Sequence, residues 1–205
     1  QFNNIYIPFY SYLIMEFDEL VAKRKSVRNF SKKKVSWKDI LEAVDIALQG
    51  PFAGNQNNLK FLIIENENTI KEIAKSCEQS WVGNSRVLVV VCSDDTHLEN
   101  LYGERGRIYS RQHAGAAIYM FLLKLVDLGL GGCWVGAYAD ELVKQKLKIP
   151  QHIQIEAIIP VGYGGESSGV EKPKKKLENA LYWEEWKQDR RPTVFEENRE
   201  DYTPK

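Results

Sequence analysis

The stretch RVLVVVCS, residues 86–93, decides the fold class of this 205-residue chain. It is rich in valine, and no charged residue interrupts it after Arg86. A β-branched run that is apolar on both faces is typical of a buried strand. Two further apolar runs, LKFLIIEN at residues 59–66 and IQIEAIIPVGY at residues 153–163, also predict strands.

Helical patterns separate these strands. Ser36 followed by Asp39 resembles a capping box, and the apolar residues after it recur with helical spacing: Ile40, Leu41, Val44, Ala47 and Leu48. Gly50-Pro51 ends that helix. Other helices are predicted over residues 16–25, 68–77, about 107–128 and 140–149. Because strands alternate with helices, the class is α/β or α+β.

Composition indicates an ordinary globular protein. The chain has 28 basic and 28 acidic residues, and 43% of its residues are hydrophobic. Zero net charge argues against a nucleic-acid binder, which normally has a basic surplus. The positive charge is nevertheless concentrated: residues 23–34 hold seven basic residues and no acid, and residues 172–176 hold four more. No run is long enough to predict a membrane span.

The three cysteines, Cys77, Cys92 and Cys133, form no CxxC pair, and the three histidines show no metal-ligand spacing. We therefore expect no metal site and no disulfide framework. Apolar filler is the favoured role for each cysteine, and a reducing cytoplasm is the expected compartment.

We expect one domain at residues 15–177 with an extension at each end. Residues 1–14 are apolar and aromatic, which fits either an extension upstream of the usual start or an arm that packs on a partner subunit. Residues 178–205 are polar and charged but contain five aromatic residues. They are expected to pack on a partner subunit, with a disordered tail as the alternative.

Four separate segments suit parts of one ligand. The first segment contains two guanidiniums, an ammonium and a hydroxyl, from Arg24, Lys25, Ser26 and Arg28. This combination of groups suits a phosphate. The second, residues 50–58, is rich in carboxamides that suit the polar edge of a flat heterocycle. The third, residues 129–137, is rich in glycine and lets backbone approach a planar ring. The fourth is the basic run at residues 172–177. Each alone also fits an ordinary loop, core turn or solvated surface.

Together, these segments resemble the FMN-dependent nitroreductase family. The resemblance lies in the order of five motifs: RxSxR, PxAGNxN before a strand, LGLGxxWxG after a long helix, VGY, and KPKKKL. The resemblance runs from about Phe17 to Leu177. It implies an α+β fold with a mostly antiparallel sheet flanked by helices. It also implies an intertwined homodimer with FMN at the interface.

By the same resemblance, the residues that would bind FMN come from both subunits. Those of one subunit are Arg24, Lys25, Ser26, Arg28, Cys133, Trp134, Gly136, Ala137, Lys174 and Lys176; those of the partner are Phe52, Ala53, Gly54, Asn55 and Asn57. Arg28 would stabilise the anionic reduced flavin, so that no side chain is needed as acid or base. The family usually has Ser in place of Phe52 and Gln in place of Asn57, and many relatives have Asp in place of His113.

The resemblance further implies a ping-pong reaction. NAD(P)H delivers hydride to the flavin, and a nitroaromatic, quinone or free flavin then takes the electrons. Two alternatives stay open: another flavin reaction, such as reductive dehalogenation or flavin fragmentation, and flavin binding without turnover. The segment from His97 to Tyr109, with Tyr102, Arg105 and Tyr109, is the candidate lid over the ring.

Overall fold

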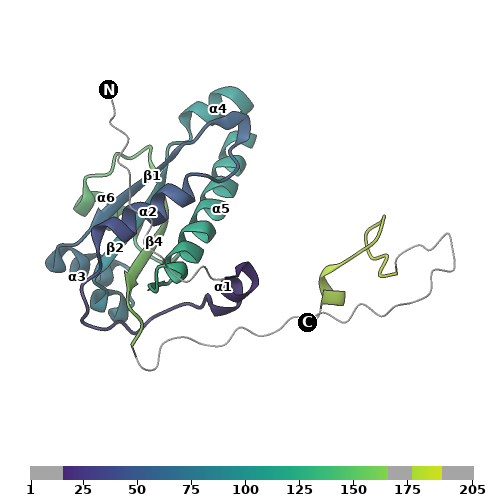
Figure 1. The fold of residues 1–205 in the computed structure, drawn as a ribbon. Helices are drawn as coiled ribbons and strands as arrows, with labels where there is room; N and C mark the ends of the chain where they lie inside the picture. Colours follow the sequence, from purple (N-terminus) through teal and green to yellow (C-terminus); the bar gives the residue numbers. More distant parts are fainter. Residues whose placement is uncertain (1–15, 166–176, 191–205) are drawn as a thin grey trace, which may run out of the picture. The chain divides into compact units, whose positions relative to one another are not determined.

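A four-stranded antiparallel sheet forms the centre of the molecule (Figure 1). The computed structural model describes residues 16–165 and 177–190. The strand order is β1 (Leu59–Ile64), β2 (Val87–Ser93), β4 (Gln154–Gly162), β3 (Gly131–Gly132). The three strands predicted from sequence are therefore confirmed, and the apolar stretch at residues 87–93 lies inside the sheet, between β1 and β4.

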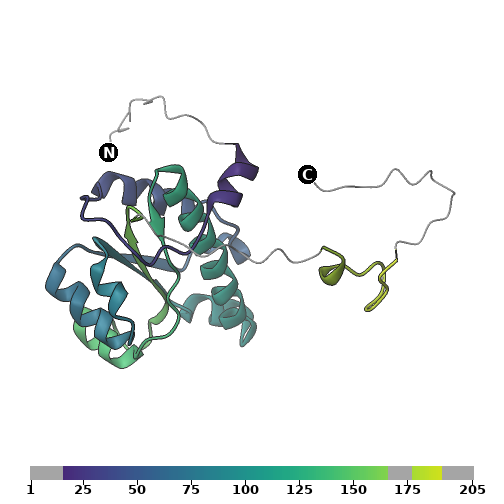
Figure 2. The same cartoon turned by 90° about the horizontal axis from the view of Figure 1, so that it is seen from below.

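Strand β2 is buried on both faces, as the sequence predicts, and its alternate residues enter two separate cores. Val87, Val89 and Val91 pack with α2 (Trp37–Ala47) and α5 (Arg105–Asp127). Leu88, Val90 and Cys92 pack with α3 (Glu67–Ser76) and α6 (Asp140–Leu147). Figure 2 shows the resulting layers, with one helix pair on each face of the sheet. This confirms an α+β fold with an antiparallel sheet flanked by helices.

A β-bulge interrupts the pairing of β2 with β4 between Val91 and Cys92. Val91 lies opposite Ala157 and Cys92 opposite Ile155, so Glu156 is the extra residue on β4. The Glu156 carboxylate accepts a hydrogen bond from Ser93 and pairs with Arg111 of α5. The bulge thus places a carboxylate, with a side chain only 8% exposed, between the sheet and α5.

Helix α2 starts as predicted but buries only part of its apolar set. The Ser36 hydroxyl oxygen accepts a hydrogen bond from Lys38 N at 3.2 Å, which caps the first turn. Ile40 and Ala47 are fully buried, whereas Leu41 and Leu48 are 48% and 36% exposed. The helix predicted from this spacing is confirmed, and Leu41 and Leu48 lie on a second, outward face with Trp37.

The first helix, α1 (Phe17–Lys23), is shorter than predicted and buries no residue. The described residues also form three short 3-10 helices: η1 (Ala53–Asn55), η2 (Ser80–Asn84) and η3 (Leu177–Ala180). One further α-helix, α4 (Thr96–Tyr102), lies within the candidate lid and was not predicted as a helix. No helix in residues 16–165 or 177–190 is both long and apolar enough to span a membrane.

The chain divides into two units, Gln1–Val170 and Glu171–Lys205. In the described part of the second unit, the rings of Tyr182 and Trp186 meet edge to face at 4.9 Å. Residues 1–14, like residues 191–205, lie outside the described residues, so the roles expected for the two extensions stay predictions.

Candidate functional site

Two of the four predicted segments lie side by side. Ser26 forms a parallel β-bridge with Gly132, and Val27 N–H donates to Gly132 O at 3.1 Å. Gly131 permits this approach, because a Cβ there would stand 2.4 Å from Val27 Cγ2. Residues 24–28, here called the basic segment, therefore adjoin residues 129–137, the glycine-rich segment.

The basic segment presents its cations beside aromatic rings. The Arg24 guanidinium lies 6.0 Å from the Tyr119 ring centroid, and the Arg28 guanidinium lies 5.8 Å from that of Trp81. Arg24 Nε is buried and has no hydrogen-bond partner in the described part of the chain. A buried donor without an acceptor is uncommon, and an anionic ligand here would satisfy it.

The glycine-rich segment alternates between core and surface. Cys133 and Val135 are buried, and Val135 exchanges two backbone hydrogen bonds with Ile158, of 3.0 and 3.1 Å. Trp134, Gly136 and Ala137 face outward, and a Cβ on Gly136 would meet nothing within 4 Å. The outward residues leave room for a flat group, and the Cys133 thiol is directed away from it. The burial of all three cysteines confirms their predicted role as apolar filler.

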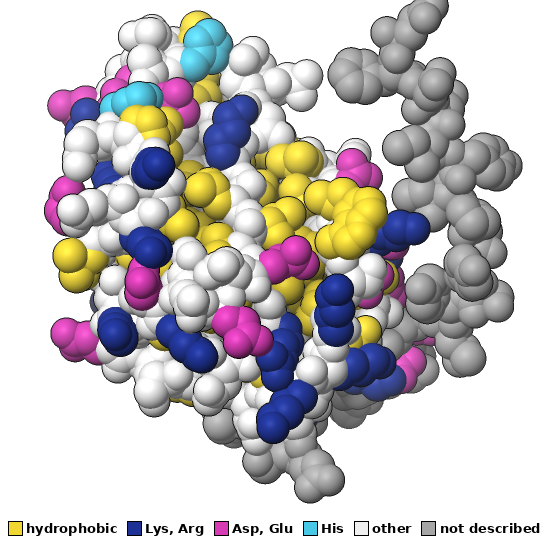
Figure 3. All heavy atoms as spheres, turned by 90° about the vertical axis from the view of Figure 1, so that its left-hand side faces the viewer, with side chains coloured by type: hydrophobic (Ala, Val, Ile, Leu, Met, Phe, Trp, Pro, Cys, Tyr) yellow, Lys and Arg dark blue, Asp and Glu magenta, His cyan; other side chains and the backbone are white. Residues whose placement is uncertain are grey.

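Apolar and basic surfaces adjoin on the molecule. Figure 3 shows a face on which hydrophobic side chains form a central patch, with Lys and Arg side chains around it and Asp and Glu side chains interspersed among them. Such a surface suits a ligand with both a flat apolar ring and an anionic end.

Within the second segment, residues 52–57 (here called the amide loop) are formed around η1. Gly54 has a φ of 57°, and a Cβ there would stand 2.5 Å from the Tyr102 hydroxyl. Both the backbone conformation and the space beside Tyr102 therefore favour glycine. Asn57 Oδ1 accepts from Leu59 N at 3.0 Å, which fixes the start of β1. Among the described residues, no hydrogen bond, ion pair or ring contact joins the amide loop to the basic or glycine-rich segment of its own chain.

His113, to which the sequence assigned no role, holds the amide loop. Its Nε2 accepts the Ala53 N–H at 2.7 Å, and its Nδ1 lies 3.0 Å from Asn58 Oδ1. The ring of Phe52 meets the imidazole edge to face at 5.1 Å. The side chain is buried, and burial lowers its pKa below the usual 6.5. A neutral imidazole with the proton on Nδ1 satisfies both contacts.

The hydrogen bonds continue from His113 into the molecule. Asn58 Nδ2 donates to Ser110 Oγ at 2.6 Å, and Ser110 Oγ donates to Asp95 Oδ1 at 2.6 Å. Ser110 is fully buried, and Asn58 and Asp95 nearly so. We call His113, Asn58, Ser110 and Asp95 the polar chain. Its members come from three parts of the sequence, which is why no local pattern indicated it.

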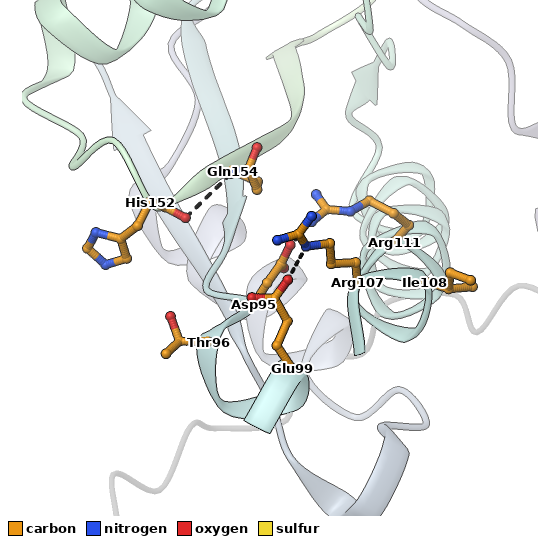
Figure 4. A pocket seen from close by; sticks show the side chains of 8 residues that line it. All are labelled: Asp95, Thr96, Glu99, Arg107, Ile108, Arg111, His152 and Gln154. Atoms are coloured by element: carbon orange, nitrogen blue, oxygen red, sulfur yellow. Dashed lines mark hydrogen bonds and ion pairs between the residues drawn. The ribbon is translucent and has the colours of Figure 1, made fainter. Parts of the chain in front are cut away.

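The polar chain ends at an open hollow of about 690 Å³ (Figure 4). Arg111 pairs with both Asp95 and Glu156, and Arg107 pairs with Glu99. Burial raises the pKa of Glu156, while Ser93 and Arg111 oppose that rise. Each guanidinium of this hollow has a carboxylate partner, and the hollow contains none of the predicted site residues.

Comparison with known proteins decides the family. The family model described as the Nitroreductase family matches residues 21–101 and 77–163. The chain belongs to the nitroreductase family. Membership makes it a flavin-dependent oxidoreductase, as the sequence predicted.

Three relatives of this chain illustrate the range of the family. A protein named iodotyrosine deiodinase, from Thermotoga neapolitana, is 27% identical over 71% of this chain and 87% of its own. A protein provisionally named NADH dehydrogenase/NAD(P)H nitroreductase, from Methanothermobacter thermautotrophicus, is 28% identical over 76% of this chain and 81% of its own. The crystal structure of a nitroreductase family protein from Clostridium novyi is 27% identical, with a TM-score of 0.69 over 84% of this chain and 96% of that one.

This chain departs from the usual family residues in the amide loop. Phe52 turns inward, against His113 and the core between the sheet and α5, so it contributes packing rather than a polar contact. The oxygen of Asn57 is occupied by its own strand. Lys174 and Lys176 lie outside the described residues, so their predicted role stays a prediction.

The candidate lid consists of α4 and the start of α5. Gly106 lets the two helices touch, since a Cβ there would stand 2.4 Å from the Leu98 backbone. The rings of Tyr102 and Tyr109 meet edge to face at 5.3 Å, and the Arg105 guanidinium lies 6.0 Å from the Tyr109 ring centroid. The lid therefore adjoins the amide loop through Tyr102 and Gly54.

Proposed function

We propose that the chain binds FMN and uses NAD(P)H to reduce quinones, nitroaromatics or flavins in a ping-pong reaction. When bound, FMN supplies the hydride and electron transfer, so no acid–base side chain is required. The family membership and the provisional name of the archaeal relative support this proposal. The observation that carries it is the bridge between Ser26 and Gly132, beside the unpaired Arg24 Nε.

The residues present fit an FMN site. Arg24, Lys25 and Ser26 offer cations and a hydroxyl for the phosphate, and Arg24 has a buried donor to give. Arg28 offers a positive charge toward the pyrimidine side, where it would stabilise a reduced, anionic ring. The outward backbone at Trp134, Gly136 and Ala137 offers a surface for the ring, and Cys133 contributes only its backbone. Lys174 and Lys176 would add charge at the phosphate.

A homodimer is part of this proposal, because the amide loop would serve the partner's FMN. Exposed apolar side chains on two adjacent helices support it: Trp37, Leu41 and Leu48 on α2, and Ile108 and Tyr119 on α5. The three on α2 recur with helical spacing and lie on one face. Apolar stripes of this kind are normally covered by a partner. The free, buried cysteines support a cytoplasmic location.

Reductive dehalogenation is the second candidate. The relative named iodotyrosine deiodinase favours it, and Tyr102, Arg105 and Tyr109 would offer aromatic and cationic contacts to a halogenated phenol. The acceptor then differs while the flavin site stays the same.

The test begins with purified protein. We expect a yellow protein that releases FMN on denaturation and consumes NAD(P)H steadily with a quinone or a nitrofuran. Iodide release from iodotyrosine, at a rate above that of quinone turnover, would select the second candidate. A protein that is colourless and cannot be reconstituted with FMN would contradict both candidate reactions. FMN binding without any turnover would also contradict them and would indicate a flavin-binding protein instead.

A double variant, Arg24→Ala with Arg28→Ala, tests the site itself. Each lost charge-assisted contact should cost about 1.5–3 kcal/mol of FMN binding. Lys23→Ala is the matched control, because Lys23 is the neighbouring cation but forms an exposed pair with Glu19. Equal FMN affinity in the double variant and the wild type would refute the assignment.

A further inference from the structure

His113 lies on α5 and contacts the amide loop through a hydrogen bond to the loop backbone. Its Nε2 accepts the Ala53 N–H at 2.7 Å, and Ala53 is one of the residues proposed to meet the partner's FMN. To accept this hydrogen bond, Nε2 of His113 must be unprotonated. The position of the loop backbone therefore depends on the protonation state of one buried imidazole.

The polar chain fixes which nitrogen is free. Asn58 Nδ2 donates to Ser110 Oγ at 2.6 Å and to Asp94 O at 3.2 Å, so the amide oxygen of Asn58 must face His113. An oxygen accepts only, and the proton of the imidazole is thereby held on Nδ1. Asp95 anchors the far end by accepting from Ser110.

We propose that His113 is a positioning residue of the flavin site, whose neutral Nδ1–H tautomer, set by Asn58, Ser110 and Asp95, holds the amide loop in its FMN-binding conformation. This inference rests on the proposed function. His113 touches neither substrate nor cofactor; it acts through Ala53. Protonation would place an N–H of the imidazolium against the Ala53 N–H, two donors face to face, and would release the loop.

The surroundings of His113 contain few competing charges. Phe52, Ala53 and Asn58, which contact it from the loop side, do not titrate. Charged groups on the packed elements are engaged elsewhere: Glu42 of α2 with Lys124, Glu99 of α4 with Arg107, and Asp95 and Glu156 with Arg111. Tyr102, which also titrates, lies beside Gly54 rather than against the imidazole in any contact described. Burial lowers the pKa of His113, so the neutral form predominates at pH 7 and above.

The experiment is a titration of the FMN-free protein with FMN, followed by flavin fluorescence, from pH 8 to pH 5.5. His113→Gln supplies an amide that can accept from Ala53 and does not titrate. His152→Gln is the matched control, since it removes an exposed imidazole outside the polar chain. Riboflavin serves as a second probe, because the FMN phosphate itself titrates near pH 6.

We expect the wild-type Kd to rise with acidification, by at most about tenfold per pH unit below the pKa of His113, for both ligands. His113→Gln should bind within about threefold of wild type at pH 8 and show a flat riboflavin profile. His152→Gln should follow the wild type. A His113→Gln profile parallel to that of the wild type would overturn the inference while leaving the proposed function intact. Failure of the wild type to bind either ligand at pH 8 would overturn the proposed function instead.

The tautomer provides a second test that needs no stable variant at His113. In wild-type protein, the imidazole ¹⁵N shifts of His113 should show the proton on Nδ1 at pH 8. A proton on Nε2 would contradict the inference, because that nitrogen could not accept from Ala53.

Discussion

The two halves of the candidate site are held in different ways. The basic and glycine-rich segments meet through backbone pairing, with Val27 N–H bonded to Gly132 O and Gly131 removing the side chain that would separate them. The amide loop is held by a side chain, through the His113 imidazole and the polar chain behind it. Backbone pairing does not titrate, whereas an imidazole does. The first half should therefore be insensitive to pH, whereas the second should respond to it.

The largest effect is expected from shape in the first half. Gly131→Ala would place a Cβ 2.4 Å from Val27 Cγ2, and overpacking of this kind typically costs about 1–3 kcal/mol. Urea unfolding of the FMN-free protein should show this loss. Gly136→Ala is the matched control in the same segment, because its Cβ would meet nothing within 4 Å. Equal destabilisation by both variants would mean that the close approach at Gly131 does not matter.

A smaller loss is expected where the polar chain is cut. Ser110→Ala removes the hydroxyl that links Asn58 to Asp95, all three being buried or nearly so. Partners left without a hydrogen bond should lower the free energy of unfolding by about 1–3 kcal/mol, toward the lower end because Asp95 keeps Ser93 and Arg111. Ser80→Ala offers a control at a serine outside the polar chain. Unchanged stability in Ser110→Ala would show that the chain does not constrain the fold.

The smallest effect is the pH dependence of stability. The folded-state pKa of His113 lies below 6.5, so the unfolded chain binds the proton first as pH falls. The stability due to the neutral imidazole is present above pH 6.5 and is lost between 6.5 and the lower folded value. The difference in unfolding free energy between wild type and His113→Gln should therefore shrink on acidification. Glu156, with a raised pKa, acts in the opposite direction, but it is common to both proteins and cancels in the difference. A difference in unfolding free energy that stays constant with pH would contradict this role of His113.

Sequence predicted those features that depend on local patterns. The valine-rich strand, the long helix α5 and the cap at Ser36 all follow from spacing within about twenty residues. The convergence of the basic and glycine-rich segments, about a hundred residues apart, came from resemblance to a family rather than from spacing. Its structural reason is that Ser26 pairs with β3, at the edge of the sheet.

The role of His113 could not be predicted, because a single histidine in a long helix has no local signal. Its partners Ala53 and Asn58 lie 60 and 55 residues away and become neighbours only when β1 packs beside α5. The exposure of Leu41 and Leu48 could not be predicted for a related reason. Helical spacing shows that a face is apolar but not whether its own chain or a partner covers it.

In the proposed dimer, one FMN site combines the basic and glycine-rich segments of one subunit with the amide loop of its partner. Hybrid dimers test it most directly. One chain would contain Arg24→Ala with Arg28→Ala, and the other Gly54→Val, which places a side chain at a positive φ against Tyr102. Neither homodimer should retain FMN. The hybrid is predicted to retain one FMN per dimer, because one site in it has both halves intact. A hybrid with no FMN would contradict a site shared between subunits.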